Sequence, residues 1–134
     1  MRAFQMTSKM ISMGGVFYPT GYAVVLFPDA EHVSKAGKEL EAAGFASEDI
    51  MELTPPVILR EIGQVKGDEA VALPSVGTEG ATVQKYINLA REGHHGLMVK
   101  ASSDDDSERM MAVVRNFPFS YGQKYHILAI EDLE

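Results

Sequence analysis

The 134-residue chain contains no cysteine. This absence excludes disulfide bonds, a catalytic thiolate and cysteine-ligated zinc, and it is typical of proteins that work in a reducing compartment. The chain also lacks an apolar run of about 20 residues, the length that crosses a bilayer. Its first residues carry no signal-peptide pattern, because Lys9 interrupts the apolar stretch and no small-residue cleavage site follows. We therefore expect a soluble, cytoplasmic protein with no membrane partner.

Basic residues are also scarce, with 12 Lys and Arg against 19 Asp and Glu and a net charge of −7. A surface that binds phosphate backbones needs clustered basic side chains, so we expect no nucleic-acid partner. The chain is 46% hydrophobic and 23% charged, which is typical of globular proteins. Its length predicts one domain over residues 1–134, large enough to bury about two-thirds of the surface of the unfolded chain.

The motifs of several catalytic and ligand-binding classes are absent as well. There is no GxSxG nucleophile elbow, and the glycine-containing stretches 77–80 and 93–96 lack the Walker spacing and the Lys-Ser/Thr that follows it. The acidic run 104–106 lacks the alternating ligands and the central glycine of a calcium loop. The sequence therefore predicts no catalytic residues, no metal site and no cofactor.

What the chain does contain is a clear helix, strand and helix between residues 79 and 117. Apolar residues at helical spacing predict a helix from about Glu79 to Glu92, which Gly93 ends. The short apolar run 96–101 predicts a strand. Ser103 is a typical helix N-cap, and the acids that follow it favour the positive end of a helix dipole, so a second helix begins at Asp104.

The same order of elements occurs in the first half of the chain. Tyr22–Phe27 predicts a strand, 30–43 a helix capped by Asp29, and 50–54 a strand, while 124–130 predicts the last strand of the second half. Two βαβ halves favour an α+β fold, a ferredoxin-like split βαβ sandwich. A flavodoxin-like parallel sheet is the alternative, and it would need one more strand and helix than the pattern shows.

Two segments lie outside these halves. Residues 1–20 are predicted to be a leader or an extra strand, in which Met13–Tyr18 would form a hairpin with the following strand. Residues 55–80 are predicted to be an insertion, with a short helix at 57–62 and a glycine-rich loop from Lys66 to Gly80.

The predicted strands are apolar on both faces, since neighbouring residues of 22–27 and 96–101 that point to opposite sides are alike hydrophobic. Helices cover one face of a ferredoxin-like sheet, which would leave the other face open and apolar. Such a face needs cover from the N-terminal segment, the insertion or a second subunit. We expect a two-fold symmetric homodimer through sheet faces or edges.

Three histidines are the candidate ligand-pocket residues. His94 and His95 follow a helix end, and His126 lies in the predicted last strand, from which it could join one of the other two. The spacing does not match an HxH or HxxxH metal motif, and a histidine near a helix C-terminus is typically explained by the helix dipole.

Several stretches resemble small bacterial general-stress proteins with ferredoxin-like halves around a glycine-rich middle. The resemblance rests on Tyr22–Phe27 with a helix ending in Ala43-Gly44-Phe45, on Glu48-Asp49-Ile50, and on Tyr86 with Arg91-Glu92-Gly93 and the strand and acidic helix start beyond it. The middle here is shorter and more charged than in that family. The resemblance implies a stress-related role and no catalytic residues.

Two hypotheses for function follow. The first is a non-enzymatic stress-related or regulatory module that acts through oligomerisation or through binding a small-molecule ligand. The second is a small dimeric ferredoxin-like enzyme with an apolar pocket on the open sheet face and a histidine as proton carrier. Because no nucleophile is paired with a base in the sequence, we favour the first.

Overall fold

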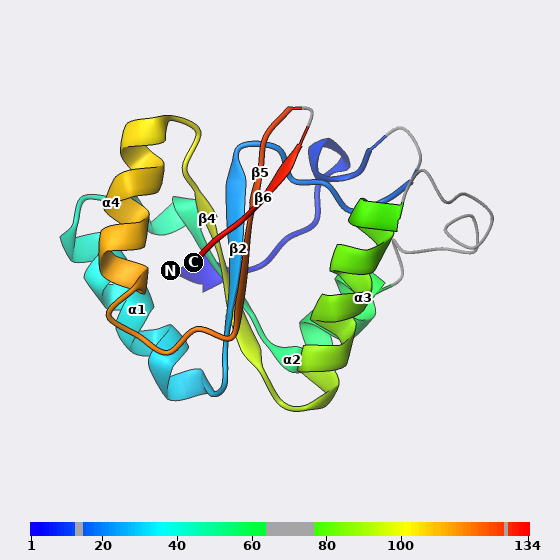
Figure 1. Ribbon diagram of the computed structural model, residues 1–134. Helices are drawn as coiled ribbons and strands as arrows, with labels where there is room; N and C mark the ends of the chain where they lie inside the picture. The colour runs from blue at the N-terminus through cyan, green and yellow to red at the C-terminus, as the bar shows by residue number, and fades with distance from the viewer. Residues whose placement is uncertain (13–14, 64–76, 128) are drawn as a thin grey trace.

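A mixed sheet with helices on both faces forms the protein, which is an α+β fold (Figure 1). The computed structural model describes residues 1–12, 15–63, 77–127 and 129–134, and the side chains of 77–79 are not described. The strands are β1 (Arg2–Ala3), β2 (Tyr22–Phe27), β3 (Ile50–Leu53), β4 (His95–Lys100), β5 (Tyr121–Tyr125) and β6 (Ile130–Asp132). The helices are α1 (Ala30–Ala42), α2 (Pro55–Val57), α3 (Gly77–Arg91) and α4 (Asp104–Val114), with short turns η1 (Ser8–Met10), η2 (Ser47–Asp49) and the π-helical η3 (Ile58–Ile62).

The strands lie in the order β1-β3-β4-β2-β5-β6. The central strand β2 pairs antiparallel with β4 on one side and with β5 on the other. Strand β3 is antiparallel to β4, β6 is antiparallel to β5, and β1 is parallel to β3. Because β1–β3 is the one parallel pair of the described sheet, the flavodoxin-like alternative is wrong.

The capping residues that the sequence indicates begin the two helices of the βαβ halves. The Asp29 carboxylate accepts a hydrogen bond from the backbone N–H of His32 at 3.0 Å, and the Ser103 hydroxyl accepts one from that of Asp106 at 3.0 Å. These bonds satisfy N–H groups that have no partner inside the helix. A hydrogen bond from Arg109 is the main cause that lowers the pKa of Asp106. The predicted starts of α1 and α4 are confirmed.

One face of the sheet is covered by α1 and α4, which lie side by side in Figure 1. Their buried apolar side chains meet those of the alternate strand residues that point to this side. The cluster contains Val33, Ala36 and Leu40 of α1, Met110, Met111 and Val114 of α4, and Ala23, Val25, Phe27, Ile50, Leu97 and Val99 of the strands. This half of the core is the helix layer that the two βαβ units predict.

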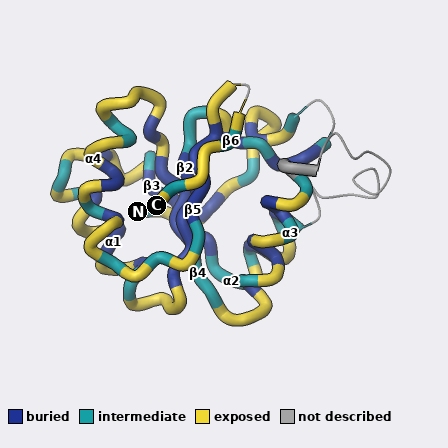
Figure 2. Tube along the Cα trace, in the orientation of Figure 1, coloured by how far each residue is buried: buried dark blue, intermediate teal, exposed yellow. Residues whose placement is uncertain are grey.

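The opposite face is covered too, and the expectation that helices shield one face alone is wrong. Helix α3, the turn η3 and the N-terminal segment bury the residues of β2, β3 and β4 that point to this side (Figures 1 and 2). The covering residues include Phe4, Met10, Val16, Phe17, Ile58, Ile62, Val83, Tyr86 and Ile87. Of the three covers that the sequence suggests, the chain itself therefore supplies two.

A tyrosine pair ties α3 to the sheet within this second layer. The hydroxyl groups of Tyr86 and Tyr125 lie 2.7 Å apart, and both side chains are buried. Burial raises the pKa of Tyr86 well above its ordinary value, with the neighbouring Tyr125 as a further cause. The phenol of Tyr86 therefore remains a neutral hydrogen-bonding group inside the apolar layer at neutral pH.

The N-terminal segment does not form the predicted hairpin arm. Residue Met13 lies outside the described residues, and the described remainder makes a single bridge between Ile11 and Phe17. Val16 and Phe17 are consecutive, yet both are buried in the same cluster. A regular strand would send them to opposite sides, so the need to bury both side chains overrides the strand pattern. Further upstream, Arg2–Ala3 form β1 at the sheet edge.

The last predicted strand, 124–130, is also wrong in its bounds. Strand β5 begins earlier, at Tyr121, and the chain turns after it, with the backbone N–H of His126 donating to the carbonyl of Ala129 at 2.8 Å. Ile127 is 80% exposed, although its residue type suggested a buried strand position. Residues 121–124 pair with residues 23–26 of β2, and this pairing sets the register of β5. The chain beyond Tyr125 turns back to form β6.

In the described part of the middle of the chain, the helices occur close to where the sequence predicts them. The short helix predicted at 57–62 is present as α2 and η3, and α3 begins at Gly77, two residues before the predicted start. Residues 66–76 of the predicted loop 66–80 lie outside the described residues, and the prediction is wrong for 77–80, which belong to α3.

Candidate functional site

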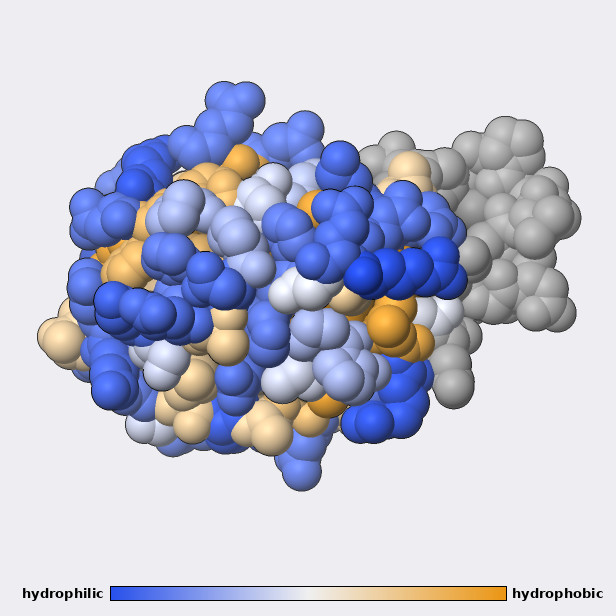
Figure 3. All heavy atoms as spheres, turned by 90° about the horizontal axis from the view of Figure 1, so that it is seen from below, coloured by the Kyte–Doolittle hydropathy of each residue, from blue (hydrophilic) through white to orange (hydrophobic). Residues whose placement is uncertain are grey.

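The three candidate histidines lie at opposite ends of the sheet. His95 pairs with Phe27 at the end of β2, whereas His126 follows β5, whose residue Lys124 pairs with Ala23 near the start of β2. The expectation that His126 could join His94 or His95 is therefore wrong. Figure 3 views the end of the molecule at which β4 begins, and the surface there is mainly hydrophilic, with apolar residues in separate patches.

His94 is held by the side chain of Ser120, which lies just before β5. The hydroxyl of Ser120 donates to the carbonyl of Leu26 at 3.0 Å. Its oxygen is then free to accept from Nδ1 of His94, which lies 2.8 Å away. With the hydroxyl proton on the Leu26 carbonyl, the His94 tautomer that carries a proton on Nδ1 completes this chain of hydrogen bonds by donating to Ser120. The pair anchors the start of β4 to the start of β5.

His95 and His126 show no sign of a metal centre. Nδ1 of His95 is buried and makes no hydrogen bond in the described part of the chain, while Nε2 of His126 lies 2.9 Å from the carboxylate of Glu131. Within the described residues, no group of three or more histidine, aspartate or glutamate side chains could hold a metal ion.

The feature that stands out is a hollow lined by three basic side chains. It has a volume of about 490 Å³ and lies where β1 and β2 begin and β4 ends. The residues that line it are Arg2, Thr7, Ser8, Lys9, Met10, Pro19, Thr20, Tyr22 and Lys100. We call it the basic hollow. None of its lining residues is acidic, in a chain whose net charge is −7.

The basic side chains of this hollow have no carboxylate partner among the described residues. Arg2 donates to the carbonyl of Glu48 at 2.8 Å and to the side-chain oxygen of Gln5 at 3.3 Å, both neutral acceptors. In the described structure, Lys9 and Lys100 make neither a side-chain hydrogen bond nor an ion pair. By contrast, Lys35 and Arg109 each contact a carboxylate. Three positive charges without a counter-charge at one hollow give it an attractive potential for anions.

Hydroxyl groups add further unused donors to the basic hollow. Thr7, Ser8, Thr20 and Tyr22 line it, and none of their hydroxyl groups forms a hydrogen bond with the residues that the structure describes. Tyr22 and Lys100 are cross-strand partners at the ends of β2 and β4, so the sheet fixes their spacing. Positive charges and hydroxyl donors together are the groups that bind the oxygens of phosphate or carboxylate.

A second hollow of about 460 Å³ adjoins the first, since Thr20 lines both. Its other lining residues are Gly21, Ser102, Lys124, Tyr125, His126, Ile127 and Ala129. We call it the histidine hollow. It contains the candidate residue His126 and no acidic lining residue, and Ile127 and Ala129 give it an apolar side.

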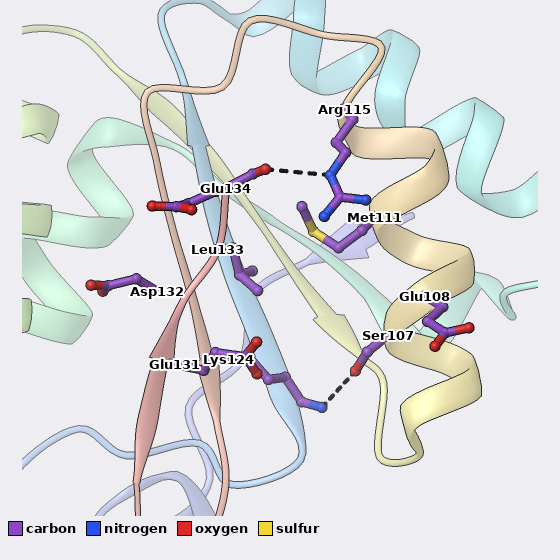
Figure 4. Close-up of a pocket in the computed structure, with 9 residues that line it drawn as sticks. All are labelled: Ser107, Glu108, Met111, Arg115, Lys124, Glu131, Asp132, Leu133 and Glu134. Carbon is purple, nitrogen blue, oxygen red and sulfur yellow. Dashed lines mark hydrogen bonds between the residues drawn. The ribbon is translucent and has the colours of Figure 1, made fainter.

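A third cleft differs because four of its nine lining residues are acidic and its two cations are already engaged (Figure 4). It lies between α4 and the β5–β6 pair and has a volume of about 330 Å³. Nζ of Lys124, whose residue is 3% exposed, donates to the hydroxyl of Ser107 at 2.8 Å. Nε of Arg115 donates to the backbone oxygen of Glu134 at 3.3 Å. The carboxylates of Glu108, Glu131 and Asp132 would repel an anion there.

Sequence reasoning missed the basic hollow because its residues come from distant parts of the chain. Arg2, Lys9 and Lys100 form no motif, and they become neighbours only when the N-terminal segment crosses the sheet beside the end of β4. The one available signal was that Tyr22 begins one predicted strand and that Lys100 lies next to the end of another, 96–101.

Comparison with protein-family models, with curated proteins and with solved structures finds no match to this chain. Among the helices in the described ranges, none is long and apolar enough to cross a membrane.

Proposed function

We propose that the protein is a non-enzymatic regulatory module that binds a small anionic ligand in the basic hollow. The observation that carries the proposal is the set of three cations, Arg2, Lys9 and Lys100, that share one hollow without a lining carboxylate. Lys35 of α1 shows the contrast, because its Nζ lies 2.9 Å from the carboxylate of Glu31. An anion bound in the basic hollow would act as the counter-charge for its cations, as the carboxylate of Glu31 does for Lys35.

The strand order supports a ferredoxin-like description of the central part of the fold. Strands β3-β4-β2-β5 are consecutive in the sheet and antiparallel, and α1 and α4 lie on one face. We propose that these elements are a ferredoxin-like unit, to which β1, β6 and α3 are additions. The stress-related role implied by the family resemblance and the cytoplasmic location remain predictions.

The charge of Lys100 provides the test. We expect inorganic phosphate to bind the wild-type protein and to raise its melting temperature, and we expect Lys100→Gln to weaken that binding about tenfold, the effect of losing one charge-assisted hydrogen bond. Titration calorimetry at low ionic strength measures the affinity. High salt should weaken binding, because exposed charges are screened.

Lys38→Gln is the matched control for this experiment. Lys38 is an exposed lysine of α1 outside the lining of the basic hollow, and its replacement changes the net charge by the same amount. An equal loss in both variants would show a general charge effect and would contradict a defined site. Absence of phosphate binding to the wild-type protein would also contradict it.

We further propose that the protein forms a two-fold homodimer, now through a sheet edge. Both sheet faces are buried within one chain, so dimer formation is not needed to cover an open apolar face. The edges are β1 and β6, and edge strands present unpaired backbone groups that can pair with a second copy. We expect light scattering at micromolar concentration to give twice the chain mass. A monomer mass would refute the dimer.

The enzyme hypothesis depends on an apolar pocket at an open sheet face. The strand residues of that face are buried beneath α3, η3 and the N-terminal segment. The hydroxyl of Ser120 donates to the carbonyl of Leu26, so its contact with His94 adds no support to the enzyme hypothesis. Ligand binding without catalysis is therefore the function that the geometry supports best.

A further inference from the structure

We infer that the ligand is an organic phosphate whose phosphate group lies in the basic hollow and whose organic part extends past Thr20 into the histidine hollow. This inference rests on the proposed function, and it names the chemical class of the ligand. It is carried by the contact between two hollows of different character, one charged and the other partly apolar, that share Thr20.

The charge of the basic hollow favours phosphate over carboxylate. A phosphate monoester carries about −1.5 to −2 charges at pH 7 and has three acceptor oxygens. Three cations, from Arg2, Lys9 and Lys100, match that charge better than they match a single carboxylate. The unused hydroxyl groups of Thr7, Ser8 and Thr20 supply donors for the remaining oxygen lone pairs.

The histidine hollow provides space and apolar contact for the part of the ligand that bears the phosphate. Ile127 is 80% exposed, more than any other large apolar side chain that the structure describes, and it lines this hollow together with Ala129. Each hollow is within the range of about 300–1,000 Å³ that small-molecule sites occupy. Inorganic phosphate would occupy only part of the basic hollow and would leave the histidine hollow, with the exposed Ile127, in contact with water.

The test compares phenyl phosphate with inorganic phosphate by titration calorimetry on the full chain. We expect phenyl phosphate to bind at least tenfold more tightly, because its ring covers Ile127 and Ala129. Lys100→Gln should lower the affinity of the protein for both ligands, since both place a phosphate group in the basic hollow. Ala129→Phe should fill the histidine hollow and remove the advantage of phenyl phosphate, while the affinity for inorganic phosphate stays unchanged.

Ile127→Ser is a second variant, and we expect it to fold normally because the Ile127 side chain is 80% exposed. We expect this variant to lower the affinity for phenyl phosphate several-fold and to leave the affinity for inorganic phosphate unchanged. Equal affinity of the two ligands, with no effect of Ala129→Phe or Ile127→Ser, would overturn this inference and leave the basic hollow as a site for the inorganic ion. Failure of both ligands to bind would overturn the proposed function as well.

Discussion

Replacing Phe17 by alanine is expected to lower the free energy of unfolding by about 3–5 kcal/mol, the usual cost of deleting a buried aromatic side chain. Phe17 is fully buried, and its ring makes edge-to-face contacts with Phe4, Tyr86 and Tyr125. These partners come from the N-terminal segment, α3 and β5, so one ring joins three parts of the second layer. Chemical denaturation followed by circular dichroism measures the effect.

Ile127→Ala is the control for Phe17→Ala. It also removes a large apolar side chain, but from a position that is 80% exposed, and we expect a change within about 0.5 kcal/mol. A small effect of Phe17→Ala would mean that the N-terminal segment does not cover the sheet. The basic hollow would then lose its wall as well, because Lys9, Met10, Pro19 and Thr20 belong to that segment.

The parts of the fold that the sequence predicts are those with local signals. Asp29 and Ser103 begin helices because their side chains bond to backbone groups three residues away, and the central strands are recognised by their uniform apolar character. The predicted last strand failed for the opposite reason. Residues 127–130 are apolar and β-prone in sequence, but the register between β2 and β5 is a contact between distant segments that a local pattern cannot contain.

The cover of the second sheet face shows the same limit. The sequence indicated that an apolar face needed shielding, and it could not decide between the chain and a second subunit. Val16 and Phe17 lie between Gly15 and Pro19, in a stretch with no regular pattern, yet they close the face. The candidate site depends on this closure, since the basic hollow forms where that stretch crosses the ends of β2 and β4.

Gly96→Ala should also destabilise the protein, by about 1–3 kcal/mol, through overcrowding. Gly96 lies in β4 opposite Leu26 on one side and Leu53 on the other. A Cβ atom there would lie 2.6 Å from Cδ2 of Leu26 and 3.2 Å from the carbonyl oxygen of Val25. Leu26 is fully buried, so its side chain would have to shift inside the core, and the Val25 carbonyl belongs to the central strand β2. Thermal or chemical denaturation measures the loss.

Gly80→Ala tests whether this loss arises from crowding or from the change of residue type. Gly80 lies in α3, and a Cβ atom there would have no neighbour within 4 Å among the described residues outside the helix's own backbone. Alanine is the better helix former by about 0.8–1.0 kcal/mol, so the same substitution should stabilise the protein at this position. Opposite signs at the two glycines would show that the close approach of β2 and β3 to β4 requires glycine at position 96. A stabilised Gly96→Ala variant would contradict the register on which both sheet faces, and the hollow at the end of β4, are built.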